Sequence, residues 1–171
     1  PPGQQAGFTL TELLVVLLIL GVVLGIAGLS PEPVEAQKIE SASADIADAL
    51  RFAGAEALRT TSNFGVQFGV DSRFNTSKDT VTVFYEKDGA NQIASHPISG
   101  KPYQFAIEAP LLGAEIDFAA NFDSRVTVVF DGSESRAGAP LISEPGTVTI
   151  ISGQISRIIT VDNVTGRVTS Q

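Results

Sequence analysis

Several residue types are absent or scarce in this chain of 171 residues. It has no cysteine, no methionine and no tryptophan, and only one histidine. Without cysteine there is no disulfide framework, and with a single histidine the common zinc sites and cysteine–histidine dyads are excluded. The first residue is not methionine either, so we expect the precursor to start further upstream.

Positive charge is scarce as well. The chain has 11 basic residues against 19 acidic ones, which gives a formal net charge of −8. Such a surface repels phosphate backbones and anionic lipid head groups. The basic residues are scattered from Lys38 to Arg167 instead of forming a cluster. We therefore expect no nucleic-acid partner from the charge balance.

One long apolar run lies near the N-terminus, with no charged residue from Leu13 to Pro31. A helix over Phe8–Leu29 would be about 33 Å long, which matches a hydrocarbon core of roughly 30 Å. A secretory signal peptide is the alternative, but its apolar core has only about 7–15 residues before a small-residue cleavage site. Here Pro31-Glu32-Pro33 follows the run, so we predict a membrane-spanning or membrane-stored helix.

Glu12 is the one acid within this segment, four residues after Phe8. At that shallow depth a buried charge costs less than at the bilayer centre. The alternatives are a head-group-level acid without a role and a functional acid, and we favour function because ionisable residues in membrane segments commonly mark it. Gly21, Gly25 and Gly28 either permit close helix packing or reflect the ordinary glycine content of such helices.

The rest of the chain predicts a helix followed by a β region. Small apolar residues recur at three- and four-residue steps over residues 35–61, which indicates a helix with one buried face. Over residues 64–170, β-branched and aromatic runs alternate with turn-forming residues and predict antiparallel strands packed on that helix. The runs are Phe64–Val70, Thr80–Glu86, Tyr103–Ile107, Glu115–Phe118, Val126–Phe130, Thr147–Ile151, Ile155–Val161 and Arg167–Thr169.

No catalytic constellation is evident, so we expect no enzyme, no cofactor and no metal site. His96 lies in a Ser-His-Pro loop without a Gly-x-Ser-x-Gly elbow. Asp45 and Asp48, three residues apart on the predicted helix, indicate a solvated face and not a metal pair. The segment Asp131-Gly132-Ser133-Glu134 has clustered oxygens that suit Ca²⁺, but it lacks the EF-hand spacing and favours a polar turn.

The N-terminal motif carries a family resemblance. Gly7-Phe8-Thr9-Leu10-Thr11-Glu12-Leu13-Leu14-Val15-Val16 resembles the cleavage and methylation signature of type IV pilins and type II secretion pseudopilins. The resemblance implies that a prepilin peptidase cuts between Gly7 and Phe8 and that Phe8 is N-methylated. It also implies that Glu12 meets the amino group of Phe8 on a neighbouring subunit, where the opposite charges offset each other's burial. Residues 1–6 lack the basic residues usual in such leaders.

A second, narrower resemblance covers most of the remaining chain. The helix Asp45–Arg59 and the C-terminal runs from Gly146 to the Gly166-Arg167-Val168 turn are similar to the GspH/FimT family of H-type minor pseudopilins and FimT-type minor pilins. The implied fold is α+β and pilin-like: a long N-terminal helix, half transmembrane and half amphipathic, packed on an antiparallel β-sheet head. The implied division is a leader remnant at 1–7, a hydrophobic assembly helix at 8–30 and a periplasmic head at 31–171.

The function implied by this resemblance is structural. The chain would be a minor pilin or pseudopilin in the bacterial inner membrane, single-pass with a periplasmic head, extracted into a pseudopilus or type IV pilus at or near its tip. Its partners would be other pilins, the prepilin peptidase and the inner-membrane assembly platform. The alternative is a FimT-like tip subunit that binds DNA through Arg157 and Arg167, although two arginines on an acidic head make a weak, salt-sensitive site.

Overall fold

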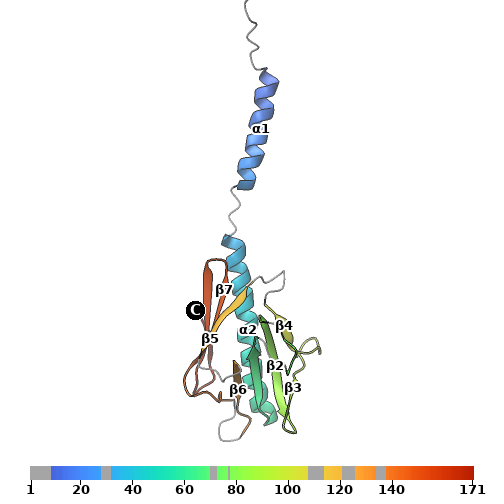
Figure 1. The fold of residues 1–171 in the computed structure, drawn as a ribbon, viewed down its shortest axis with the longest axis vertical. Helices are drawn as coiled ribbons and strands as arrows, with labels where there is room; N and C mark the ends of the chain where they lie inside the picture. Colours follow the sequence, from blue (N-terminus) through green and yellow to red (C-terminus); the bar gives the residue numbers. More distant parts are fainter. Residues whose placement is uncertain are drawn as a thin grey trace, which may run out of the picture. The chain divides into compact units, whose positions relative to one another are not determined.

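The computed structural model describes residues 9–27, 32–69, 73–76, 78–107, 114–120, 126–133 and 138–171. They belong to two units, Pro1–Pro33 and Val34–Gln171. The helix α1 (Leu10–Ala27) lies in the first unit. The helix α2 (Glu32–Thr60) lies in the second unit except for its first two residues, together with all the strands (Figure 1).

The surface of α1 is apolar on all sides. Thr11 and Glu12 in its first turn are its only polar side chains, and every side chain described from residue 9 to residue 23 is exposed. A helix without a polar stripe needs lipid or other helices to cover it. Among the described residues, no helix has both the length and the apolar character needed to cross a membrane. Phe8 and residues 28–30 of the predicted helix lie outside the described residues.

The buried face of α2 consists mainly of small side chains, which allow strands to approach the helix closely. They recur at three- and four-residue steps: Ile39, Ala42, Ile46, Ala49, Leu50, Ala53 and Ala57. The predicted helix over 35–61 thus agrees with α2 apart from its ends. The helix stops at Thr61, whose φ of 53° lies in the left-handed region.

The first antiparallel sheet has the strand order β3-β2-β1-β6 among the described residues, with β4 also paired to β2. Its strands are β1 (Phe64–Phe68), β2 (Thr80–Lys87), β3 (Ala90–Ile93), β4 (Gln104–Ala106) and β6 (Thr127–Phe130). The strands β3 and β4 share one side of β2: β3 pairs with its second half and β4 with its first. At the opposite edge of the sheet, the backbone of residues 139–141 forms hydrogen bonds with β6 and with Asp131, which follows it, and Pro140 is bridged to Phe130.

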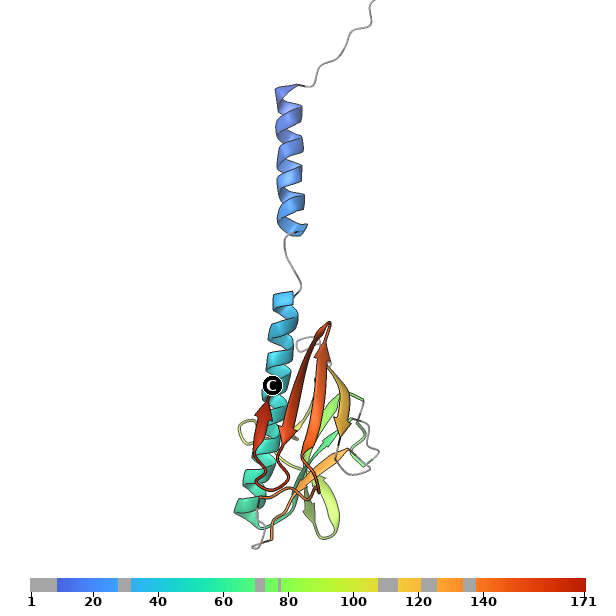
Figure 2. The ribbon, with the colours of Figure 1, turned by 90° about the vertical axis from the view of Figure 1, so that its left-hand side faces the viewer.

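The second antiparallel sheet has the order β5-β7-β8-β9. Its strands are β5 (Glu115–Ala120), β7 (Gly146–Ser152), β8 (Ile155–Val161) and β9 (Val168–Ser170). One cluster of buried side chains joins α2 with strands of both sheets, and Figures 1 and 2 show α2 running alongside them. The predicted helix and antiparallel head are therefore confirmed, but the strands form two sheets where one was expected.

One further hairpin-like element matters for the site. Residues 94–103 leave the first sheet after β3 and return at β4, and we call them the 94–103 arm. The two sides of the arm are cross-linked: Tyr103 N donates to the Ala94 carbonyl at 2.7 Å, Ser95 is bridged to Pro102, and His96 N donates to the Lys101 carbonyl at 2.8 Å. These bonds fix the arm as an extension of the sheet.

Candidate functional site

The N-terminal end of α1 is closed by a reciprocal pair of hydrogen bonds between Thr9 and Glu12. The Thr9 amide and hydroxyl both donate to Glu12 Oε2 at 3.3 Å, and the Glu12 amide donates to Thr9 Oγ1 at 3.3 Å. This is a capping box, in which a Thr at the N-cap and a Glu three residues later satisfy each other's backbone donors. The Thr-x-x-Glu spacing signals it in the sequence, and our sequence reasoning missed it.

Glu12 therefore has a local structural role beside any role in assembly. Only one of its two carboxylate oxygens is used: Oε1 accepts no hydrogen bond from any described residue. Gly7 and Phe8, the predicted cleavage and methylation sites, lie outside the described residues. In the sequence, Glu12 follows Phe8 by four residues.

Gly21 of α1 presents open surface. A Cβ added to Gly21 would meet no atom within 4 Å. Gly28 lies outside the described residues, so the predicted glycine spacing is seen only in part. Gly21 leaves a shallow point on an otherwise bulky apolar surface, as helix–helix contacts in membranes require.

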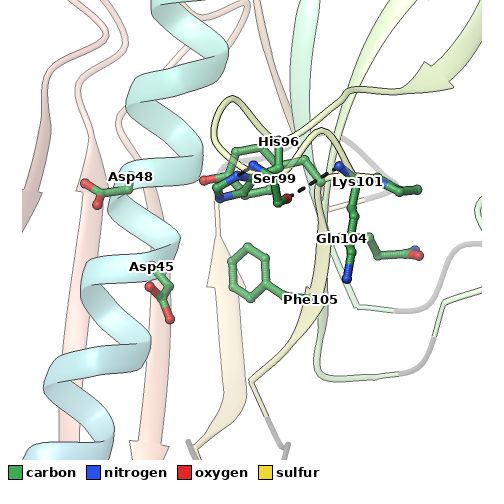
Figure 3. A pocket seen from close by; sticks show the side chains of 9 residues that line it. Asp45, Asp48, His96, Ser99, Lys101, Gln104 and Phe105 are labelled. Carbon is green, nitrogen blue, oxygen red and sulfur yellow. Dashed lines mark hydrogen bonds between the residues drawn. The ribbon is translucent and has the colours of Figure 1, made fainter.

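In the head, the carboxylates of Asp45 and Asp48 lie beside a cavity of about 400 Å³. Figure 3 shows them on α2, with His96 and Ser99 on the 94–103 arm and Phe105 on β4 at the other side. Asp48 Oδ1 accepts a hydrogen bond from Arg51 Nη1 at 3.0 Å. Partial burial, and then the charge of Asp48, raise the pKa of Asp45. The described residues contain no group of three His, Asp or Glu side chains that would hold a metal.

His96 is a structural histidine of the arm. Its Nδ1 accepts hydrogen bonds from the amides of Ile98 at 3.2 Å and Ser99 at 3.4 Å. The ring packs edge-on against Tyr103, with 4.6 Å between centroids. The Ser99 hydroxyl accepts a bond from the Lys101 amide. Since Nδ1 is an acceptor, the neutral ring carries its proton on Nε2, and no serine–histidine dyad forms on this arm.

In the described part of the polar segment after β6, Asp131–Ser133, two backbone amides donate to side-chain oxygens. Asp131 Oδ1 accepts the Ser133 amide at 2.8 Å, and the Gly132 amide donates to Asn63 Oδ1 at 3.0 Å. A Cβ on Gly132 would fall 2.4 Å from the backbone of Ser62, so glycine is required for the close approach of two chain segments. Glu134 lies outside the described residues.

The two arginines of the DNA-binding alternative do not come together. Arg167 lies at the turn after β8, where its carbonyl accepts the Asp162 amide. Arg157 lies on β8, five positions before Asp162, so at about 3.4 Å per residue the backbones of Arg157 and Arg167 are roughly 17 Å apart. Arg157 Nη2 already donates to Glu40 Oε2 at 3.2 Å. The two arginines therefore do not form a joint basic site, and the DNA-binding alternative finds no support.

Comparisons with known proteins agree with the N-terminal motif and with the fold described above. Residues 3–28 match the model of the prokaryotic N-terminal methylation motif. The fold is similar to EpsH, the minor pseudopilin of the type 2 secretion system of Vibrio cholerae: 17% identity and a TM-score of 0.54, covering 78% of this chain and 96% of that chain. The fold is pilin-like.

A second pilin-like structure supports the same conclusion. It is FimU, a type IV minor pilin of Pseudomonas aeruginosa, with 13% identity and a TM-score of 0.51 over 80% of this chain and 90% of that one. At such identities the likeness concerns the fold. A search of proteins with curated functions returned no significant sequence match. The chain thus shares the methylation motif in its sequence and the helix with an antiparallel head in its fold.

Proposed function

We propose that this chain is a minor pilin or pseudopilin subunit, built into a filament through α1. The observation that carries the proposal is an apolar helix with its side chains exposed, headed by one acid and lying within the matched methylation motif. Such a surface has to be covered, either by lipid before assembly or by other apolar helices in a filament. The similar structures come from a secretion system and from a type IV pilus, so both kinds of filament fit.

The proposal includes processing at the N-terminus. A prepilin peptidase cuts between Gly7 and Phe8, and the new amino group of Phe8 is methylated. The segment at 8–30 then holds the subunit in the bacterial inner membrane, with the head of residues 31–171 in the periplasm, until an assembly platform extracts it. Cleavage creates a positively charged amino group on Phe8, four residues before the carboxylate of Glu12. Assembly in this proposal depends on the attraction between these two opposite charges.

The capping box suggests how Glu12 serves two purposes at once. Its Oε2 keeps the Thr9 bonds and so keeps the first turn of α1 intact. Its Oε1 remains available for an ammonium group, and a charge-assisted bond to the Phe8 amino group of a neighbouring subunit would set the axial register of the entering helix. Pairing also offsets the cost of burying both charges among apolar helices.

Two substitutions separate these purposes. Glu12→Gln keeps an acceptor at the capping position but removes the charge, whereas Glu12→Ala removes both. We expect both variants to insert in the membrane and to be cleaved normally. We expect both to fall at least about tenfold in the sheared filament fraction, since an ammonium–carboxylate bond contributes about 1.5–3 kcal/mol. Quantitative immunoblots of membrane and filament fractions, in cells with the assembly machinery, measure this.

A third variant provides the control. Thr9→Ala breaks the cap but leaves the charge, and we expect it to enter filaments with a smaller loss than Glu12→Gln. If Glu12→Gln assembles like the parent chain while Glu12→Ala does not, the acid acts only through the helix cap, and the charge-pairing role is wrong. Failure of either Glu12 variant to be cleaved would instead point to recognition by the peptidase.

A further inference from the structure

The cavity between α2 and the 94–103 arm is not explained by filament assembly through α1. Its volume of about 400 Å³ is within the range of small-ligand sites, roughly 300–1,000 Å³. Carboxylates line it from α2, and aromatic rings line it from the arm and β4 (Figure 3). The combination of acids and rings is suited to a cation, which aromatic faces attract through their quadrupole.

The charges around the cavity leave one carboxylate uncompensated. Asp48 is paired with Arg51 at 3.0 Å, but Asp45 has neither an ion pair nor a hydrogen bond among the described residues. Lys101, the cation on the opposite wall, is exposed and forms no ion pair with any described residue. His96 uses its Nδ1 lone pair on two amides of its own arm. The carboxylate of Asp45 is therefore available to pair with a cationic group that enters the cavity.

Tyr103 adds a polar group to the wall of the cavity. Its side chain lines the cavity and the residue is only 8% exposed, yet its hydroxyl has no hydrogen-bond partner among the described residues. Burial, and then the charges of Asp48 and Asp45, raise its pKa, which places the phenol in the field of both acids. The hydroxyl oxygen itself is not among the buried unpartnered atoms of the described residues, so it is accessible from the cavity and available to a group that fills it.

The arm next to the cavity presents an apolar side chain to solvent. Ile98, at the tip of the arm, is 92% exposed, although the arm around it is held by the His96, Ser99 and Lys101 bonds. A rigid loop that displays a large aliphatic side chain beside a charged cavity has the features of a protein contact: an anchor pocket and an adjacent apolar contact.

We infer that this cavity binds the basic side chain of a partner protein, an arginine or a lysine, between Asp45, Tyr103 and Phe105. The partner contacts Ile98 with an apolar residue next to that basic side chain. A second copy of this chain is a poor partner because both carry a net charge of −8 and repel each other. The inference does not depend on the filament role of α1.

Tyrosine fluorescence gives a direct test, because the chain has two tyrosines and no tryptophan. In a Tyr85→Phe background, Tyr103 is the only tyrosine left. The probes are N-acetylarginine methylamide and its neutral isostere, N-acetylcitrulline methylamide, added to the full chain in non-ionic detergent. We expect a saturable change of Tyr103 emission in the millimolar range with arginine and none with citrulline. Asp45→Asn should weaken arginine binding about tenfold, as loss of one charge-assisted bond implies.

Two further experiments test the kind of partner and the location of the site. Glu40→Gln, on the same helix but outside the cavity, should leave arginine binding unchanged. Acetyl-Leu-Arg-amide should bind several-fold more tightly than acetyl-Arg-amide, and Ile98→Ser should abolish only that gain. No emission change with arginine, an equal response to citrulline, or an Asp45→Asn variant that binds like its parent overturns the cation site. A leucine that adds nothing overturns the protein partner and leaves a site for small cations.

Discussion

At the scale of single residues, Gly65 packs closely against Phe84 in the head. The two are directly opposed in the β1–β2 register, and the edge atoms Cζ and Cε1 of the Phe84 ring lie next to the glycine. A Cβ added to Gly65 would fall 2.4 Å from Phe84 Cζ and 3.0 Å from the Val128 carbonyl. Phe84 is 3% exposed, so the ring supplies the apolar cover that glycine itself lacks.

We expect Gly65→Ala to lower the free energy of unfolding by about 1–3 kcal/mol, because the ring and a backbone carbonyl must both move. Denaturant unfolding of the full chain in detergent, followed by circular dichroism, measures the change. Gly54→Ala is the matched control: its Cβ would meet Phe130 at 3.4 Å, an ordinary contact, and in mid-helix alanine is favoured over glycine by up to about 1 kcal/mol. Equal effects of the two substitutions would contradict the packing argument.

At the scale of elements, Asp79 connects the two sheets. It directly precedes β2, is 3% exposed, and accepts the amide of Ile116 in β5 on Oδ1 at 2.9 Å. Its carbonyl accepts the Ile107 amide at 2.9 Å. One buried residue thus fixes the start of β5 against the first sheet, through a bond to a strand far along the chain.

We expect Asp79→Ala to destabilise the fold by about 1–3 kcal/mol, since the Ile116 amide loses its buried partner. Asp79→Asn keeps an oxygen at the same place and should cost less. Hydrogen exchange at the Ile116 amide is the specific measurement: protection should fall in the alanine variant and be retained in large part with asparagine. Unchanged protection in Asp79→Ala would show that the bond does not hold β5.

The sequence predicts the elements better than their pairing. Periodicity located α2 and most strands within a few residues, because it depends on which face is buried. The short strand β3 was missed although Asp88-Gly89 precedes it; both residues have positive φ, as a tight hairpin turn requires. Local pattern does not determine which strands share a sheet, so the Asp79–Ile116 bond and the division into two sheets came only from the structure.

The candidate sites also differ in how far the sequence predicts them. Glu12 and the methylation motif are contiguous in sequence and were predicted, because their chemistry depends on spacing along one helix. The cavity was not predicted, since Asp45 on α2 and Tyr103 on the arm meet only in three dimensions. The predicted solvated face of Asp45 and Asp48 is correct in exposure but overlooks the aromatic wall opposite.

At the scale of the whole molecule, the excess of acidic residues lowers the stability of the folded state, and this effect can be measured at Asp45. Partial burial and the charge of Asp48 raise its pKa from the ordinary value of 3.8. The folded state therefore holds this proton more tightly than the unfolded state, and the charged form disfavours folding. The penalty is present at neutral pH and disappears as the pH falls through the raised pKa toward 3.8.

We therefore expect Asp45→Asn to raise the melting temperature at pH 7 and to make little difference near pH 3.5. The gain is below about 1 kcal/mol, because the carboxyl is largely exposed and screened by solvent. Asp48→Asn is the control: it relieves the same repulsion but loses the Arg51 pair, so we expect little net change. A substitution at Asp45 that stabilises the fold yet weakens arginine binding would mark the acid as retained for binding.

The way β3, β4 and residues 139–141 flank the first sheet has a consequence for crowded subunits. Exposed strand edges recruit strands from other molecules and lead to aggregation. Here one edge of β2 is taken up by two short strands, and the edge of β6 is occupied by a segment whose Pro140 has no amide to donate. In the proposed filament, the first sheet is thus protected at β2 and β6 against pairing with the strands of a neighbouring subunit.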